Sequence, residues 1–274
     1  MKSGMSSFTD RIPLRWRRRL RRMIKNARHG LSPTPRDQAR TLIVAGVQRS
    51  GTNMVMDLLD RSMHTDVYHE TDPRAYDRYE MRDLEVIQDL HDRSRAPAFV
   101  IKALCELQDL PNMLDRFAPA RAVWVVRDYR DVVNSMLRSF PSQKREIELL
   151  VDDPNGNRWM GKGMSMETHQ LLRRLWEQGL DDPSAAAFIW YFRNILFFEQ
   201  ALDRDPRVSV MFYEELVTAP DIQLHRLFDF FGLPYRPAIA RDVFSSSIRK
   251  RQGPPINAEV AALCEEMLAR FRKA

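Results

Sequence analysis

Residues 41–53, TLIVAGVQRSGTN, decide the fold of this chain. The apolar run at their start is typical of a buried strand, and it leads through Gly46 and Gly51 to a hydroxyl residue, Thr52. A strand, a glycine-rich turn and a helix in this order form an anion-binding loop, because backbone N–H groups at the helix N-terminus point toward the ligand. The stretch therefore predicts an α/β fold with an anion site after its first strand.

The loop lacks the lysine that a nucleoside triphosphate site requires. In the pattern GxxxxGK[ST], the lysine contacts the outer phosphates and the hydroxyl binds magnesium. Here Thr52 stands at the lysine position, Asn53 stands at the hydroxyl position, and the cation of the loop is Arg49. These differences argue against ATP-dependent phosphoryl transfer and favour a metal-free anion with less charge than a triphosphate.

Beyond residue 40 the chain alternates short β-branched runs with helical patterns. Strands are predicted at 41–47, 65–70, 98–104, 121–128 and 207–216, and each of the first four is followed by a helix. This rhythm predicts a single three-layer, P-loop-like α/β domain over residues 41–274, with a central parallel sheet flanked by helices. Ligands of such a sheet bind at the carboxyl ends of its strands.

The composition agrees with one globular domain. The chain has 274 residues, of which 44% are hydrophobic and 29% charged, and no apolar run approaches the roughly 18 residues that cross a bilayer. Cys105 and Cys264 lie far apart without CxxC spacing, so neither a disulfide framework nor a zinc site is predicted. We expect a reducing, cytoplasmic location.

The net charge of +6 is divided unevenly along the chain. Residues 1–40 hold 12 Lys and Arg against 2 Asp and Glu, a balance of +10, which leaves −4 for residues 41–274. A slightly acidic body argues against a broad nucleic-acid surface but allows a local anion pocket built from a few arginines. We therefore expect no nucleic-acid partner.

Residues 1–40 form a basic amphipathic extension and linker. Within residues 11–29, helical spacing gathers apolar side chains in an arc of about 100° and leaves the arginines outside it. We call this set the apolar stripe: Trp16, Leu20, Met23, Ile24 and Ala27. Two interpretations stay open, because such a helix can lie on an anionic membrane surface, here the inner face, or can pack its stripe against the domain.

A second anion group is predicted at the end of the fourth strand. In VVRDYRDVVNS, residues 125–135, Arg127 ends the strand and Ser135 follows two helical turns later, with Asp131 midway. Arg127 and Ser135 can reach one phosphate together, and their separation from the first loop implies a second phosphate on the same ligand. Two anion groups indicate a bisphosphorylated nucleotide.

Three motifs in this order resemble the signatures of the PAPS-dependent sulfotransferase family. RSGTN is similar to the family's 5′-phosphosulfate loop, RDYRDVVNS to its 3′-phosphate motif, and VMFYEEL to its strand followed by YED[LM]. The motifs span residues 42–216, and the arginine in the loop resembles the bacterial and Golgi branch. The resemblance implies transfer of a sulfuryl group from 3′-phosphoadenosine 5′-phosphosulfate (PAPS) to a hydroxyl or amine, without a metal.

The resemblance also implies which residues bind the donor. It assigns the 5′-phosphosulfate to Arg49, Ser50, Gly51, Thr52 and Asn53, the 3′-phosphate to Arg127 and Ser135, the adenine to Tyr213, and the 3′ end to Ser247, Arg249 and Lys250. Simpler interpretations also remain. Tyr213 can form a wall of the core, and the segment with Ser247, Arg249 and Lys250 can be a solvated run of charge.

The transfer also requires a base that accepts the proton of the acceptor. Many cytosolic members use a histidine in the segment KTHLP, whereas the corresponding IKALC keeps Lys102 and has Leu104 in place of the histidine. Glu70, in VYHETDP, resembles the glutamate base of the tyrosylprotein branch, and its neighbour His69 is a weaker candidate. Lys102 is expected to position the sulfate or support Glu70, and Arg49 to offset charge on the leaving phosphate.

The acceptor stays open at this point, because its pocket is expected in the variable helical stretch 141–205 and in loops. Carbohydrate, glycolipid and protein tyrosine are compatible with the sequence, and the first two are favoured. Two other functions remain: a small-molecule kinase of P-loop type, and a non-catalytic adaptor that binds a membrane surface through residues 11–29.

Overall fold

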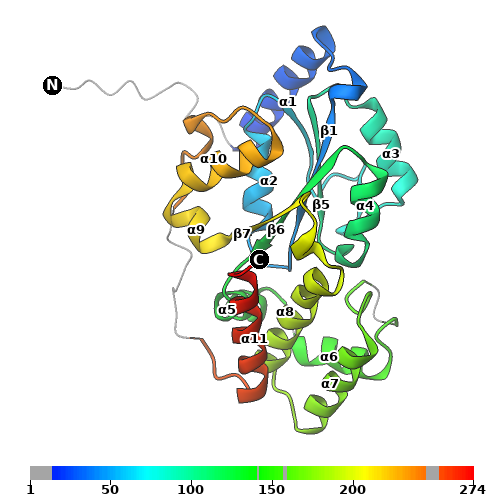
Figure 1. Cartoon of the computed structure of the whole chain (residues 1–274), viewed down its shortest axis with the longest axis vertical. Helices are drawn as coiled ribbons and strands as arrows, with labels where there is room; N and C mark the ends of the chain where they lie inside the picture. The colour runs from blue at the N-terminus through cyan, green and yellow to red at the C-terminus, as the bar shows by residue number, and fades with distance from the viewer. Residues whose placement is uncertain (1–13, 141, 157–158, 245–252) are drawn as a thin grey trace, which may run out of the picture.

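The structure, a computed structural model, describes residues 14–140, 142–156, 159–244 and 253–274. Its centre is a five-stranded parallel sheet in the order β2-β5-β1-β6-β7 (Figure 1). The strands are β1 (Arg40–Ala45), β2 (Thr65–Tyr68), β5 (Ala98–Ala103), β6 (Ala120–Val126) and β7 (Val208–Phe212). A short antiparallel pair, β3 (Tyr76–Asp77) and β4 (Glu80–Met81), lies outside this sheet. The predicted parallel α/β fold is confirmed.

β1 lies in the middle of the sheet because it is apolar on both faces. It pairs in parallel with β5 and β6, so that Ile43 lies opposite Ile101 on one side and Ala122 on the other. From Thr41 onward every residue of β1 is buried. A strand that is covered on both faces appears in the sequence as a continuous hydrophobic run, which is why it could be recognised there.

Helices cover both faces of the sheet, and alternate side chains of β1 mark the two layers. Leu42 and Val44 face the layer of α2 (Thr52–Asp60), α9 (Tyr213–Thr218) and α10 (Pro220–Phe231). Ile43 and Ala45 face the opposite layer. The helices of that layer are α3 (Leu84–Arg93), α4 (Leu110–Arg116), α5 (Tyr129–Ser139), α6 (Gln143–Asp152), α7 (Met166–Glu177), α8 (Asp182–Glu199) and α11 (Ala258–Phe271). In Figure 1, α5, α8 and α11 lie beyond the carboxyl ends of the strands.

α8 is buried along most of its length, and its polar side chains bond to the segments that follow β5 and β6. Trp190 Nε1 donates to the carbonyl of Arg127 at 3.1 Å. Arg193, which is 1% exposed, donates to the carbonyls of Leu104 and Cys105 at 3.1 and 3.2 Å. Because buried backbone carbonyls need partners, these bonds hold the carboxyl ends of both strands in place.

Two segments differ from the sequence prediction. The strand expected over 207–216 ends at Phe212, and Tyr213 begins α9. Two glutamates stand in the first turn of α9, where negative charge favours a helix. The helical pattern expected over residues 79–94 becomes helix only from Leu84, because β4 occupies Glu80–Met81.

The N-terminal helix α1 (Leu14–Leu31) packs on the domain through its polar side. Lys25 Nζ donates to the carbonyl and Oδ1 of Asp60 at 3.1 and 3.0 Å and to Thr65 Oγ1 at 3.2 Å. His29 Nε2 lies 3.0 Å from a backbone carbonyl of the segment before β2. Lys25 is 4% exposed, and burial lowers its pKa while Asp60 acts in the opposite direction.

The apolar stripe of α1 faces away from the domain. Leu20, Met23 and Ile24 are 49%, 62% and 51% exposed, and Ala27 is exposed as well, while the side chain of Trp16 lies outside the described residues. The interpretation in which this stripe packs against the domain is therefore wrong. The stripe faces outward because Lys25 and His29, on the opposite side of the helix, are buried and bond to partners beside β2. Within the described ranges, no helix is both long and apolar enough to cross a membrane.

Replacing Lys25 by alanine should release α1 from the domain. The substitution removes three hydrogen bonds to Asp60 and Thr65, and bonds to charged groups contribute about 1.5–3 kcal/mol each. We expect faster tryptic cleavage within α1, measured by limited proteolysis and mass spectrometry. Ile24→Ala, which changes an exposed side chain of the same helix, is the control. Equal cleavage of the two variants would show that Lys25 does not anchor the helix.

Candidate functional site

The loop after β1 is closed by bonds between its own residues. Ser50 donates to the carbonyl of Val47 from its backbone N at 3.1 Å and from its hydroxyl at 2.6 Å. The backbone N–H groups of Met54 and Val55 donate to the carbonyl of Gly51, so α2 begins directly after that glycine. An α-helix leaves the N–H groups at its very start without a helical acceptor, so the start of α2, before these two residues, is suited to an anion.

Gly51 is required at this position by two independent constraints. Its φ of 104° lies in the left-handed region, and a Cβ there would overlap the ring of Tyr213. Tyr213 is 4% exposed, and the guanidinium carbon of Arg127 lies 4.5 Å from the centroid of its ring. The tyrosine therefore contacts both the loop and the cation at the end of β6. A cation on an aromatic face stabilises such a contact by roughly 0.5–2 kcal/mol.

The two anion groups predicted from the sequence touch each other. Arg49 Nε donates to Ser135 Oγ at 2.8 Å, and Arg127 Nη1 donates to the carbonyl of Arg49 at 3.2 Å. Arg127 also lies 3.7 Å from the carboxylate of Asp131. The sequence analysis treats the loop and the Arg127–Ser135 group as separate, whereas in the structure the side chain of Arg49 joins them. One continuous polar surface thus runs from the loop to α5.

Glu70, Lys102 and Asn53 form a cluster beside the loop. Lys102 Nζ donates to Asn53 Oδ1 at 2.9 Å and is ion-paired with Glu70, and Asn53 Nδ2 donates to Glu70 at 3.2 Å. The side chain of Lys102 is 2% exposed, and burial lowers its pKa while Glu70 acts in the opposite direction. The Tyr76 hydroxyl bonds to the backbone N and O of Lys102 at 2.9 and 2.8 Å, which holds the end of β5. Three separate segments therefore meet at one buried ammonium group.

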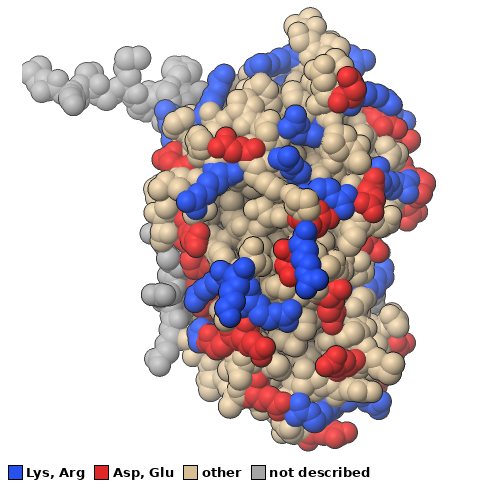
Figure 2. Space-filling view, in the orientation of Figure 1, with Lys and Arg blue, Asp and Glu red and all other residues tan. Residues whose placement is uncertain are grey.

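One cleft of about 530 Å³ is lined by the loop after β1, by Arg127 and Ser135, and by the cluster of Glu70, Lys102 and Asn53. Predicted site residues that line it are Arg49, Gly51, Thr52, Asn53, Glu70, Lys102, Arg127, Ser135 and Tyr213. Ser50 is 1% exposed, with its hydroxyl turned to Val47, so it serves the shape of the loop. On the face shown in Figure 2, basic side chains gather where Figure 1 has α5 and the C-terminal end of α11.

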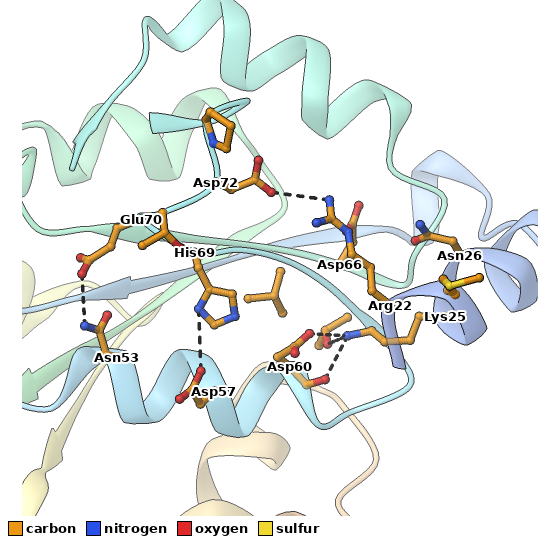
Figure 3. A pocket seen from close by; sticks show the side chains of 15 residues that line it. Arg22, Lys25, Asn26, Asn53, Asp57, Asp60, Asp66, His69, Glu70 and Asp72 are labelled. Atoms are coloured by element: carbon orange, nitrogen blue, oxygen red, sulfur yellow. Dashed lines mark hydrogen bonds and ion pairs between the residues drawn. The ribbon is translucent and has the colours of Figure 1, made fainter. Parts of the chain in front are cut away.

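His69 points away from this cleft. Its Nδ1 lies 3.9 Å from Asp57 Oδ1 on α2, whereas the neighbouring Glu70 turns toward Asn53 (Figure 3). Successive side chains of an extended segment point to opposite sides, which explains why the two candidates for the base separate. The structure thus brings Glu70, and not His69, to Lys102.

The structure also reveals residues that the sequence analysis missed. Glu214 Oε1 accepts a bond from the backbone N of Asp128 at 3.0 Å and so ties α9 to the start of α5, and burial raises the pKa of Glu214. Glu214 stands in the motif VMFYEEL, which could have signalled it, whereas Tyr76 leaves no pattern because its partners are backbone atoms. Arg78, Tyr79 and Trp159 also line the cleft. Ser247, Arg249 and Lys250 lie outside the described residues, so their role stays a prediction.

Comparison with known families gives the class of this site. Residues 39–261 match the family described as sulfotransferase domain. The chain therefore belongs to the sulfotransferase family. A search of curated proteins found no match.

Several solved structures match this one at low sequence identity. The sulfotransferase domain from the curacin biosynthetic pathway is 14% identical with a TM-score of 0.53, over 84% of this chain and 98% of that one. A sulfotransferase from Alicyclobacillus acidocaldarius is 15% identical with a TM-score of 0.49, over 85% and 94%. Mouse sulfotransferase SULT7A1, complexed with PAP, is 15% identical with a TM-score of 0.47, over 90% and 88%. At this low identity, the match with the curacin-pathway domain supports the fold alone.

Proposed function

We propose that the protein transfers a sulfuryl group from PAPS to a hydroxyl of a carbohydrate or glycolipid. One observation carries the proposal: a single cleft holds the anion loop, the Arg127–Ser135 group and the Glu70–Lys102 pair. The first two suit a ligand with two phosphate-like ends, and the third suits proton transfer. Membership of the sulfotransferase family supports the class of reaction.

In this proposal the loop and the first turn of α2 hold the 5′-phosphosulfate. Arg127 and Ser135 hold the 3′-phosphate, and Arg49 serves both ends because it reaches from the loop to Ser135. Arg49 then offsets the negative charge that the leaving 5′-phosphate gains. Tyr213, at the wall of the same cleft, contacts the adenine. PAPS would supply the sulfuryl group.

Glu70 is the proposed base. As the acceptor oxygen bonds to sulfur, the bond from sulfur to the 5′-phosphate oxygen breaks, and Glu70 takes the acceptor's proton. Lys102 and Asn53 hold both oxygens of the Glu70 carboxylate, so its position is set before the acceptor binds. Lys102 also brings a positive charge next to the transferred group.

The two other functions have less support. A P-loop kinase would need a lysine and a magnesium-binding hydroxyl where Thr52 and Asn53 stand, and Asn53 is engaged by Lys102 and Glu70. A purely structural adaptor gives no reason for a buried lysine beside a carboxylate in a cleft, since such pairs are characteristic of functional sites. Sulfuryl transfer accounts for both observations.

Arg127→Ala tests the two-phosphate donor site. We expect the wild type to bind 3′-phosphoadenosine 5′-phosphate (PAP) without magnesium and more tightly than AMP, because charged hydrogen bonds to the second phosphate contribute about 1.5–3 kcal/mol. The variant should lose roughly ten- to a hundredfold in PAP affinity and little in AMP affinity. Isothermal titration calorimetry measures both, with Arg116→Ala on α4 as the control. Equal wild-type affinity for AMP and PAP would sink the assignment.

Glu70→Gln tests the base. Glutamine keeps the size and a hydrogen-bonding oxygen but accepts no proton, so turnover should fall by about 10²–10⁴-fold while PAP affinity stays near that of the wild type. The assay follows radiolabelled PAPS into the lipid, glycan and protein fractions of a cell extract. Glu85→Gln, on an exposed side chain of α3, is the matched control. Unchanged turnover in Glu70→Gln would remove this residue from the mechanism.

We further propose that α1 attaches the protein to the anionic surface on the inner face of a membrane. Leu20, Met23 and Ile24 are exposed together, while the opposite side of the helix is held by Lys25 and His29. A basic helix with an exposed apolar side binds such a surface through both burial and charge, at about 1 kcal/mol per basic residue. The exposed stripe is the observation that favours this partner.

A double variant, Leu20→Ser with Ile24→Ser, should lose this attachment. We expect the wild type to sediment with phosphatidylserine-containing vesicles and to remain in solution with phosphatidylcholine vesicles, because both charge and apolar contact contribute. Ile222→Ser on α10, which is 58% exposed, is the control for lost surface hydrophobicity. Wild-type sedimentation of the double variant, or equal binding to both vesicle types, would contradict the proposal.

A further inference from the structure

A second cavity, of about 810 Å³, lies between α1, α2 and the segment that follows β2 (Figure 3). α1 contributes Met23 and Asn26 to its wall, α2 contributes Asp57, and the segment after β2 contributes His69 and Glu70. The volume lies within the roughly 300–1,000 Å³ of small-molecule sites. The N-terminal helix, which the sequence sets apart from the domain, is therefore a wall of this cavity.

The cavity adjoins the donor cleft at the proposed base. Asn53 and Glu70 are the two residues that line both spaces, and in Figure 3 they stand at one end of the cavity. In-line transfer requires the acceptor and the leaving group on opposite sides of the sulfuryl group. Two spaces that meet at Glu70 satisfy this requirement, with the donor in the cleft and the acceptor in the cavity.

The charges of the lining exclude an anionic acceptor. Its carboxylates are Asp57, Asp60, Asp66, Glu70 and Asp72, and its cations are Arg22 and Lys25. Both cations are paired within the cavity, because Lys25 contacts Asp60 and Arg22 Nη2 lies 3.5 Å from Asp72. Both cations of the described lining are therefore already engaged by carboxylates, so a phosphorylated or already sulfated group would find no available cation among them.

The chemistry of the lining also separates hydroxyl acceptors from other classes. Met23, Val67 and Pro73 are its hydrophobic members, and none of the described residues that line it is phenylalanine, tyrosine or tryptophan. A phenol or a flat apolar alcohol would find no ring to pack on. An amine among carboxylates would be held as ammonium, which has no electron pair for attack on sulfur. A neutral group rich in hydroxyls meets neither obstacle.

We propose that this cavity is the acceptor subsite and that it takes a neutral, hydroxyl-rich group such as a sugar ring. The inference rests on the proposed sulfotransferase function and specifies its substrate class. Carboxylate and amide oxygens along one wall accept bonds from several neighbouring hydroxyls, so the ring presents one hydroxyl to Glu70. A free glycan and the head group of a glycolipid share this chemistry. Met23 belongs to the exposed stripe of α1 and also lines the cavity, so the stripe borders this subsite.

Asp57 is the positioning residue of this subsite. It follows Asn53 by four residues on α2, so both side chains lie on one face of the helix, one turn apart. Its side chain is 39% exposed and lies 3.9 Å from His69. A hydroxyl one sugar carbon away from the reacting one would bond to Asp57 while the reacting hydroxyl contacts Glu70.

A thiol-directed block of the cavity tests the location. The native Cys105 and Cys264 are 2% and 0% exposed, and burial raises the pKa of both thiols, so a cysteine placed on α1 reacts selectively. Asn26→Cys capped with a bulky maleimide fills the cavity. Ser32→Cys capped in the same way is the control, because residue 32, directly after α1, is exposed outside both the cavity and the apolar stripe. The assay follows label from radiolabelled PAPS into neutral glycolipid, soluble neutral glycan and protein fractions of a cell extract.

We expect label in glycolipid or soluble glycan, loss of that label when position 26 is capped, and its survival when position 32 is capped. PAP affinity should be the same in all samples. The fraction that carries the label distinguishes the two sources of the sugar. Transfer that survives the block, or label confined to protein, overturns the inference while leaving the sulfotransferase function standing. Intact PAP binding with no transfer to any fraction overturns the proposed function itself, and this inference with it.

Asp57→Asn then tests whether Asp57 positions the acceptor. The substrate is the sugar that the labelling experiment identifies. A lost charged hydrogen bond should raise the KM for that sugar roughly ten- to a hundredfold, with kcat and PAP affinity near those of the wild type. Asp57→Glu should restore part of the loss, which a merely structural role would not predict. Asp89→Asn on α3, where the side chain is 71% exposed, is the control. An unchanged KM in Asp57→Asn removes Asp57 from the subsite.

Discussion

The buried ammonium group of Lys102 is the constraint on which the architecture of the site depends. A charge taken out of water costs several kcal/mol unless it is paired and hydrogen-bonded. Lys102 meets this requirement with Glu70 and Asn53, while Tyr76 holds its backbone. The buried charge therefore joins β5 to α2 and to the segment after β2, and the backbone of the same residue joins β3 to this carboxyl edge of the sheet.

The strand order explains why the polar groups of the site lie on two sides of the loop. β1 lies between β5 and β6, so the anion loop stands in the middle of the edge. Arg127 and Tyr213 follow β6 and β7 on one side of it. On the other side Lys102 lies at the end of β5, and Glu70 follows β2. Ligands of parallel sheets bind along such an edge. The Arg127–Ser135 group and the Glu70–Lys102 pair are thereby held apart on the two sides of the loop.

α1 shows how packing can reverse the expectation from a hydrophobic pattern. Its amphipathic period is visible in the sequence, and burial of the apolar side would be the usual outcome. Instead Lys25 and His29 are buried, because Asp60 and the backbone before β2 offer partners that the apolar side chains could not use. The helix thus exposes an apolar surface and at the same time lines the cavity that leads to Glu70.

The sequence by itself determined the α/β class, the anion loop and the polar residues at the strand ends. Those features depend on local order: a continuous apolar run for β1, glycines where φ is positive, and a cation or hydroxyl at a set distance from a strand. Only the tertiary structure decided that Arg49 bonds to Ser135, that Glu70 and not His69 meets Lys102, and which side of α1 is buried. Each of these depends on which distant segments become neighbours, and that is set by strand order and by the need of buried charges for partners, neither of which is written in any single stretch of the chain.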